Sequence, residues 1–443
     1  KLRPYFDTVI NNINTVANIK VINKGNIYGN DNAAGTNKNQ VAFGFNNFDS
    51  STNNTRTEMI NEGHIKLDSK KSAGIQLRPE NPNASGTSDK LGLNMMTAYN
   101  TPSGKIDINN AGSFGMLTVQ NKDASRNAVA PKTYSNYNVT TSPGGQIASR
   151  AQKENMSYMK NTGTINVGGN SSIGIGHLHN IQGVYAGGTI NVTGNSSVGV
   201  YTEVPTRPVL NNDKDDHGLT NTSGKTVGTE TVEVSGKITV SGTGSSGVFA
   251  TKTGSITLKD NRTNADADAD NRTLGKINVT GTKSYGAVLD GIKLNLEENT
   301  EISVTGKEAI GYVLKNGEGS NSGTIKVIGN DENKAGTPFK GSLGFYGEKG
   351  KFTNEKTGII EASGKIAHAV ALIGDVTATT PEIKFTNKGR INAVGGGNIG
   401  VYTDGKYEFT HTNDVGNDDS LIAAHQGAIG IYAKNPNGKL EIT

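Results

Sequence analysis

The sequence lacks cysteine and tryptophan altogether, and only 33 % of its 443 residues are hydrophobic. Without cysteine the chain has no disulfide framework, and this absence is weakly typical of long exported proteins. The low hydrophobic content is poor for a compact globular core but suits a thin central column of aliphatic side chains. No apolar run approaches the ~18 residues that a membrane-spanning helix needs.

The charges give no sign of a nucleic-acid partner. Lysine and arginine number 44 against 40 acidic residues, and both signs are scattered along the chain. A protein that binds nucleic acid is expected to gather its basic residues into a stripe or patch. We therefore expect no nucleic-acid partner.

A repeat organises the chain. Residues 163–175 read GTINVGGNSSIGI and residues 188–200 read GTINVTGNSSVGV, so one unit recurs after 25 positions. Ile165 and Val167 flank Asn166, which places the two aliphatic side chains on one face of a strand and the amide on the other. Because one such unit cannot bury its aliphatic face alone, the period predicts the stacked coils of a β-solenoid.

Each coil is predicted to contain three strands. A strand that ends in asparagine leads through a glycine turn into a second strand, as in FTNKGRINA at residues 385–393. A later strand, with glycine followed by aliphatic and aromatic residues, closes the coil. One central aliphatic residue of the second strand marks each coil, and twelve such positions predict about twelve coils. These positions are Ile27, Ile65, Ile106, Ile165, Ile190, Ile238, Ile277, Ile302, Ile325, Ile360, Ile391 and Leu440.

The marker positions are unevenly spaced because some coils contain insertions. Ile277 and Ile302 lie 25 residues apart, which measures a bare coil, whereas Ile190 and Ile238 lie 48 apart. The extra residues are rich in Asn, Asp, Thr, Pro and Lys and lack an apolar period, so we expect them on the surface. We expect insertions near residues 31–58, 78–103, 118–160, 203–233, 259–274, 329–341, 374–381 and 410–426.

The predicted fold class is all-β, a right-handed parallel β-helix of about twelve coils with loop insertions. Residues 1–19 have apolar side chains three to four positions apart, and we expect them to form an N-terminal capping segment, either a short helix or a capping strand. Residues 20–443 form the β-helix itself. The strand-like end at residues 438–443 predicts that the β-helix continues beyond this sequence.

Glycines and aromatic residues of the closing strands are the candidate ligand-binding feature. Gly74, Gly115, Gly174, Gly199, Gly247, Gly286, Gly311, Gly344, Gly400 and Gly430 form a column, and five of them have an aromatic residue two places on. Residues two apart share a face of a strand, so glycines and rings are expected to line one side of the solenoid. The rings either pack under neighbouring loops or form an adhesive strip for sugars or a partner's side chains. These rings are Tyr201, Phe249, Tyr346, Tyr402 and Tyr432.

Three short motifs point to cofactor or metal chemistry, and none fits its context. Residues 242–247 match the GxGxxG dinucleotide fingerprint, but the following VFATKTGSITL predicts a strand instead of the required helix. His177 and His179 have no acidic or cysteine partner nearby for a metal site. The acidic run from Asp266 to Asp270 lacks the glycine that turns a calcium loop. We expect no cofactor and no metal.

Catalysis is the minority interpretation. Polysaccharide lyases and hydrolases on β-helices need paired carboxylates on adjacent coils. The outward residues of the second strands are mostly Asn, Thr and Ser, and no two acids fall on neighbouring coils. These residues are Lys66, Asp107, Asn166, Asn191, Thr239, Asn278, Ser303, Lys326, Glu361 and Asn392. A surface polysaccharide-degrading enzyme and a purely structural stalk stay open as alternatives.

The repeats NTGTINV, SSVGVYTE, GKITVSG, FTNKGRINAVGGGNIGVYTDG and AIGIYAKN resemble passenger domains of large bacterial type V autotransporter adhesins, of the monomeric and fusobacterial kind. The resemblance covers almost the whole chain and describes the scaffold. It implies an exported passenger on the bacterial cell surface, anchored to the outer membrane by a C-terminal β-barrel outside this chain. It also implies adhesion to partner bacteria and to host-cell receptors or glycans. No family binding residue is carried over.

Overall fold

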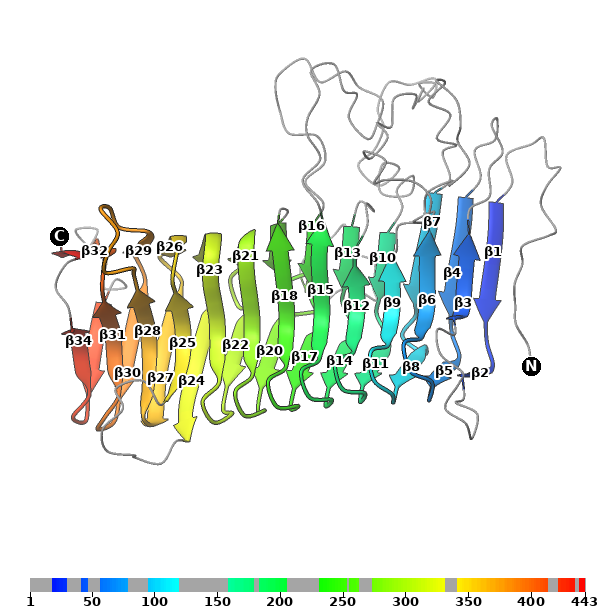
Figure 1. Cartoon of the computed structure of the whole chain (residues 1–443), viewed down its shortest axis with the longest axis horizontal. Coiled ribbons are helices and arrows are strands. Elements are labelled where there is room, and N and C mark those ends of the chain that lie inside the picture. Colours follow the sequence, from blue (N-terminus) through cyan, green and yellow to red (C-terminus); the bar gives the residue numbers. More distant parts are fainter. Residues whose placement is uncertain are drawn as a thin grey trace, which may run out of the picture.

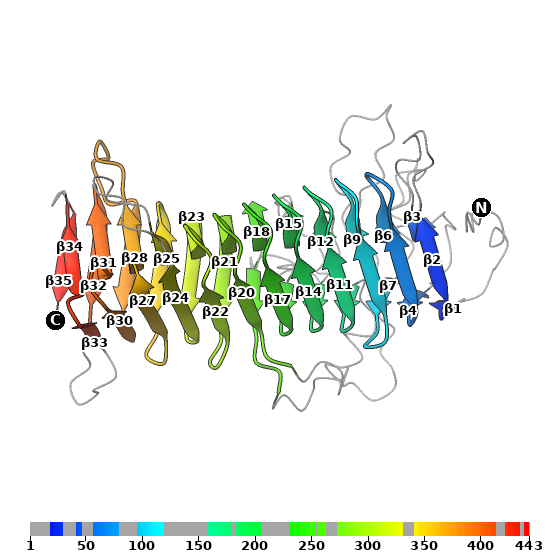
Figure 2. The same ribbon diagram turned by 90° about the horizontal axis from the view of Figure 1, so that it is seen from below.

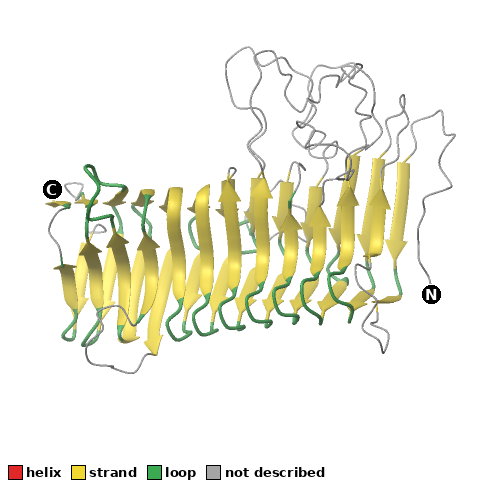
Figure 3. Ribbon diagram, viewed as in Figure 1, coloured by secondary structure: helices red, strands yellow, loops and turns green. Residues whose placement is uncertain are grey.

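The structure, a computed structural model, is a rod of strands stacked along one axis, with β1 near one end and β34 near the other (Figure 1). In the part of the chain that the structure describes, thirty-five strands occur and no helix (Figure 3), hence none that could cross a membrane. Residues 1–17 of the predicted capping segment lie outside the described residues, and residues 18 and 19 belong to β1 (Asn18–Asn23). Described are residues 18–29, 41–46, 56–78, 95–118, 158–178, 183–204, 231–252, 255–262, 273–330, 341–412, 421–434 and 438–442.

Each coil contains a first, a second and a closing strand, and every pairing between these strands is parallel. The second strands form one sheet of twelve strands in chain order, from β2 to β33 (Figure 2). They are β2 (Asn26–Gly29), β5 (His64–Leu67), β8 (Lys105–Ile108), β11 (Thr164–Val167), β14 (Thr189–Val192), β17 (Lys237–Val240), β20 (Lys276–Val279), β22 (Glu301–Val304), β24 (Thr324–Asn330), β27 (Ile359–Lys365), β30 (Arg390–Val394) and β33 (Leu421–His425).

The first and closing strands belong together to a sheet of 23 strands. They are joined because β21 (Tyr285–Leu296) and β23 (Ile310–Asn321) each run from a closing position into the next first position. The other first strands are β1 (Asn18–Asn23), β4 (Arg56–Asn61), β7 (Met95–Asn100), β10 (Tyr158–Asn161), β13 (Gly183–Ala186), β16 (Thr231–Val234), β19 (Ser255–Leu258), β26 (Gly350–Asn354), β29 (Ile383–Asn387), β32 (Tyr407–His411) and β35 (Lys439–Ile442).

The closing strands complete each coil and precede the connection to the next one. They are β3 (Val41–Asn46), β6 (Ala73–Arg78), β9 (Phe114–Thr118), β12 (Ile173–His177), β15 (Val198–Val204), β18 (Ser246–Lys252), β25 (Ser342–Gly347), β28 (Ala367–Ile373), β31 (Ile399–Asp404) and β34 (Ile429–Ala433). The two parallel sheets confirm the predicted all-β parallel β-helix.

The second strands alternate between the core and the outside as predicted. In β11, Ile165 and Val167 are fully buried while Thr164 and Asn166 are half-buried. Ile165 pairs in register with the isoleucine at the same position in each neighbouring strand, Ile106 and Ile190. Stacking at about 4.8 Å per coil therefore turns one aliphatic residue per coil into a continuous apolar column.

One marker position is wrong. Leu440 lies in β35, where it pairs with Phe409 of a first strand. The twelfth member of the isoleucine column is Ile422 of β33, which pairs with Ile391. Residues 421–425 are thus a strand inside the segment predicted as an insertion. The sequence GKLEI at residues 438–442 imitates a second strand because glycine precedes its alternation, whereas LIAAH has no preceding glycine.

The asparagine that ends a first strand belongs to a buried hydrogen-bonded ladder. In the first coils, Nδ2 of each amide donates to Oδ1 of the next at 2.7 or 2.8 Å, through Asn23, Asn61, Asn100 and Asn161. A second ladder of the same geometry runs through Asn321, Asn354 and Asn387, whose Nδ2 donates to Nδ1 of His411 at 2.9 Å. Apolar residues fill the row between the two ladders, namely Ala186, Val234, Leu258 and Leu296.

A buried serine precedes each closing strand from β6 to β21 and links successive coils in another way. The backbone N–H of Ser172 donates to Oγ of Ser197 at 3.1 Å, and that hydroxyl donates to the carbonyl oxygen of Gly169 at 2.9 Å. The same pairing recurs between Ser197 and Ser245. These side chains hold the turn residues of neighbouring coils in register.

Candidate interaction surface on the closing strands

The five aromatic residues singled out from the sequence lie in one row along the closing strands. Tyr201 pairs with Phe249, and Tyr402 pairs with Tyr432. Tyr346 stands apart from both pairs, because its register neighbours are aliphatic. The row therefore contains two aromatic pairs and a single ring between them. From β9 to β34 it reads Leu117, Gly176, Tyr201, Phe249, Val288, Val313, Tyr346, Ala371, Tyr402 and Tyr432.

The paired rings stack on each other. The centroids of Tyr201 and Phe249 are 5.7 Å apart with planes 12° from parallel, and those of Tyr402 and Tyr432 are 5.7 Å apart at 24°. Tyr402 is only 1 % exposed, whereas Tyr432 in the last closing strand is 44 % exposed.

Two tyrosines of this row stay protonated over the whole physiological range. Burial, followed by the negative charge of Glu348, raises the pKa of Tyr346 to about 12. Burial, followed by the negative charge of Asp404, raises the pKa of Tyr402 to about 12. Both phenols are therefore neutral at pH 7 and can act as hydrogen-bond donors.

The glycine column does not share the face of the rings, so that expectation is wrong. A Cβ at Gly199 would lie 2.6 Å from the carbonyl oxygen of Gly247 and 3.0 Å from Cγ2 of Ile238, a core side chain. The same contact with the next coil recurs at Gly174 and Gly286. These glycines permit close approach of successive coils and interrupt the simple alternation of the strand.

The interruption places a second row on the outside, three residues before the row of rings. Val198 and Tyr201 of β15 are both half-buried, while Val200 between them is fully buried in the core. The second row is also mostly apolar. It reads Phe114, Ile173, Val198, Ser246, Tyr285, Ile310, Leu343, His368, Ile399 and Ile429. We call the two rows together the apolar face.

The apolar face is a layer separate from the core. Leu117, Val288, Val313, Leu343 and Tyr402 are buried, yet none belongs to the cluster of packed side chains inside the coils. The closing strands thus have apolar side chains on both faces, which is typical of parallel strands covered on both sides.

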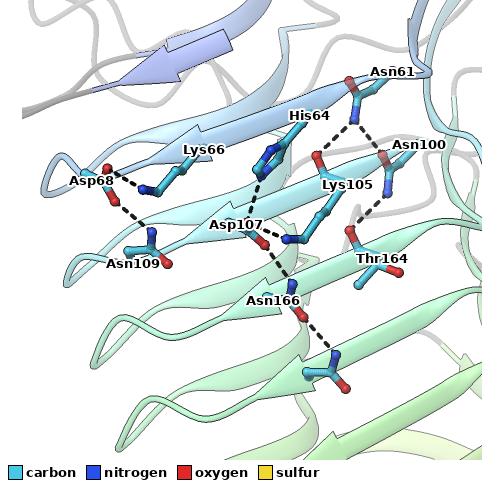
Figure 4. Close-up of polar contacts among 11 residues, drawn as sticks. Asn61, His64, Lys66, Asp68, Asn100, Lys105, Asp107, Asn109, Thr164 and Asn166 are labelled. Carbon is cyan, nitrogen blue, oxygen red and sulfur yellow. Dashed lines mark hydrogen bonds and ion pairs between the residues drawn. The ribbon is translucent and has the colours of Figure 1, made fainter. Parts of the chain in front are cut away.

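The outer face of the second strands is polar instead. Asp107 accepts hydrogen bonds from Nδ2 of Asn166 at 2.7 Å and from His64 Nε2 at 2.7 Å, and its carboxylate pairs with Lys105 Nζ at 2.9 Å (Figure 4). Asn166 in turn accepts from Asn191 at 2.8 Å. Partial burial raises the pKa of Asp107, but the hydrogen bonds outweigh it and lower that pKa overall.

The structure describes only some of the residues considered for metal or cofactor chemistry. His177 is buried in β12 with Nδ1 3.2 Å from Oγ1 of Thr202, and His179 lies outside the described residues. So does the acidic run 266–270. Gly247 opens no helix but lies within β18. Across the described residues, no three His, Asp or Glu side chains are grouped to hold a metal ion.

The outward row tested for catalysis exists as predicted. Asp107 is followed along it by Asn166, and Glu361 lies between Lys326 and Asn392. Carboxylates on neighbouring coils are therefore absent from this row, and Glu361 is paired with Lys326 at 3.6 Å. Sequence reasoning missed the aliphatic members of the apolar face, the buried amide ladders and the serine links.

Comparison of the chain with family models, with curated proteins and with solved structures gives no match. The class that the structure itself defines is a long all-parallel β-solenoid.

Proposed function

We propose that the chain is part of a bacterial cell-surface adhesin, a rigid β-helical rod that presents loops to partner bacteria or to host-cell receptors and glycans. The observation that supports this most is the unbroken ladder of second strands, twelve of them paired in chain order from β2 to β33. At about 4.8 Å per strand the ladder is about 55 Å long. Such a rod gives reach and stiffness, which suit the presentation of a binding surface at a distance.

The rod is stiff because neighbouring coils are linked at several points around their circumference. The backbone of β14 pairs with β11 and β17. The buried amide of Asn100 bridges to the coils on either side of it. Bending would have to stretch these bonds on one side of the rod, so the coils are held in a fixed relation.

The longest insertions leave the rod at one corner. Residues 119–157 connect β9 to β10, and residues 205–230 connect β15 to β16, so both follow a closing strand and precede a first strand. Both lie outside the described residues. Loops on a rigid scaffold are common binding sites, and we place recognition in the insertions 118–160 and 203–233. The finer proposal, from the resemblance of the repeats, is the passenger of a monomeric type V autotransporter.

The test is a binding screen of the 443-residue chain against partner bacteria, host cells and arrayed glycans. Two variants replace residues 119–157 or 205–230 by a short turn. A matched control shortens residues 331–340, which connect β24 to β25 at another corner. We expect each loop variant to keep its strand content by circular dichroism, and at least one of them to lose binding. Unchanged binding in both would contradict the placement of the site.

The same protein separates an adhesin from a depolymerase and from a stalk. Incubation with acidic and neutral polysaccharides, followed by an assay for new reducing ends or unsaturated products, measures cleavage. We expect binding without cleavage. Cleavage would replace the adhesin by a polysaccharide-degrading enzyme, and a protein that neither binds nor cleaves would be a structural stalk.

A further inference from the structure

The apolar face extends over ten successive closing positions, from β9 to β34. None of its residues is Asp, Glu, Lys or Arg. Its one titratable imidazole, His368, stays neutral at pH 7 because burial lowers the pKa of this side chain to about 4. A stripe of this kind differs from the outer face of the second strands, where charges and amides form hydrogen-bonded networks.

The stripe is long enough to be the centre of an interface. Ten strands about 4.8 Å apart span about 45 Å, and two rows three residues apart lie about 10 Å from each other. The two lengths enclose about 450 Å², roughly half of the ~800 Å² that one partner contributes to a standard interface, so a contact would also use the side chains on either border. Half-buried members such as Tyr201, Phe249 and Ile310 supply the accessible part of the face, because Val288, Val313 and Leu343 are buried.

We propose that the apolar face packs against the apolar face of a second copy of this chain, giving a side-by-side homodimer. The rings recur at the spacing of the coils, because Tyr201 and Phe249 are register partners and stack along the row. A partner whose side chains interleave with this row needs the same 4.8 Å period, and a second copy has it. The interaction is independent of the ligand binding proposed above.

The border of the face favours a protein partner over a membrane. Beyond the row of rings, the closing strands continue with Asp290, Lys315 and Glu348, which are of both signs. Asp404 and Lys434 form an ion pair at 3.2 Å on the same border. Anionic lipid surfaces attract clusters of basic residues, which this border lacks among the described residues. An apolar centre with a rim of mixed charge is the usual composition of a protein interface.

A two-fold axis across the rods would make the contact self-complementary. Each coil of one copy would then face a coil of the other, and the assembly would close as a dimer. Two sheets that pack face to face lie about 10 Å apart with interleaved side chains. Residues near the middle of the stripe, such as Ile310, would lie closest to the axis if the whole face is used.

The test is sedimentation equilibrium of the 443-residue chain from low to high micromolar concentration. One variant combines Phe249→Lys with Tyr285→Lys on the apolar face. Its control combines Thr239→Lys with Asn278→Lys, which add the same charges to the same two coils on the second strands. We expect a reversible dimer for the native chain and the control, and a dissociation constant raised by about tenfold or more in the first variant. A native chain that stays monomeric throughout would overturn the proposal.

Because the chain has no cysteine, single cysteines provide a measurement that tolerates a partly destabilised variant. Under mild oxidation, Ile310→Cys should form disulfide-linked dimers faster than Asn278→Cys on the polar face. Equal rates would contradict the proposal. Binding of monomeric native protein to vesicles of neutral phospholipid, lost in the Phe249→Lys and Tyr285→Lys variant, would instead assign the face to a lipid surface.

Discussion

The corner between first and second strands is filled in two different ways along the rod. Near both ends it holds the buried amide ladders, in which each side chain donates to the next coil. In the middle coils the same row is apolar, with Val234 and Leu258 in register and buried. One backbone geometry therefore accepts either solution, provided that neighbours in the row are alike.

Where an amide ladder meets the apolar section of this row, a buried amide lies next to an apolar side chain and loses a hydrogen bond. Nδ2 of Asn161 faces Ala186, and Oδ1 of Asn321 faces Leu296. Both atoms are buried and have no hydrogen-bond partner among the described residues. A buried polar atom without a partner costs about 1–3 kcal/mol, and each of these two borders leaves one such atom.

Breaking a ladder in its interior should have the largest effect. Asn354 accepts from Asn321 and donates to Asn387, both at 2.8 Å. Asn354→Leu leaves a buried donor and a buried acceptor unsatisfied, and we expect a loss of about 3–5 kcal/mol in unfolding free energy. Urea denaturation followed by circular dichroism measures it. The matched control is Leu296→Met in the apolar section, which should cost below ~1.5 kcal/mol. Similar losses in both would contradict the role of the ladder.

The C-terminal coils should lose stability in acid. Burial lowers the pKa of His368 from 6.5 to about 4, and burial also lowers the pKa of His411 at the end of the second ladder. As pH falls below 6.5 the unfolded chain takes up protons that the folded chain excludes. Stability should therefore be full above pH 6.5 and fall towards pH 4, by about 3 kcal/mol for His368 alone. Melting temperatures of the native chain and of His368→Gln across this pH window test it; parallel curves would contradict the assignment.

Placing an amide in the apolar section should be destabilising but rescuable. Val234→Asn buries an amide between Ala186 and Leu258, and we expect a loss of about 2 kcal/mol. Adding Ala186→Asn extends the first ladder from Asn161 through both new amides. The double variant should then recover about 1 kcal/mol relative to the sum of the single changes. A double-mutant cycle in urea gives this coupling, and strict additivity would show that the amides do not bond.

The amide ladder on the outside should matter least. Asn166 donates to Asp107 and accepts from Asn191 in the same geometry as the buried amides (Figure 4). Water can replace these bonds because the side chain is half-buried. We expect Asn166→Ala to cost about 0.5–1 kcal/mol, measured by thermal melting. A loss as large as that of Asn354→Leu would mean that the greater exposure of the outer ladder does not reduce its contribution to stability.

The sequence predicts the coil because its signal is local and repeated. Alternation around Ile165 and Ile190 identifies the second strands, and the glycine turn before them sets where each begins. Leu440 was misassigned because this turn signal occurs before a first strand there, whereas Ile422 follows no glycine. The sequence pattern alone cannot distinguish a first strand from a second strand when an insertion replaces the glycine turn between them.

The apolar face was only half predictable. The rings of Tyr201 and Phe249 stand out by their size, and their common row follows from the repeat. Val198 was missed because alternation counted from Val200 places it in the core, whereas the alternation is interrupted at Gly199 and Val198 is half-buried. The ladder of Asn61 and Asn100 needs knowledge of which coils touch, and that depends on the lengths of insertions.

Paired cysteines test the stacking of the coils most directly. Asn191 and Thr239 are register partners on adjacent second strands, and Asn278 lies one strand further on. Adjacent Cα atoms about 4.8 Å apart suit a disulfide, whereas about 9.6 Å is too far. We predict that Asn191→Cys with Thr239→Cys forms an intramolecular disulfide under mild oxidation, and that Asn191→Cys with Asn278→Cys does not. Equal oxidation of the two pairs, or none in the first, would contradict a stack of coils in this register.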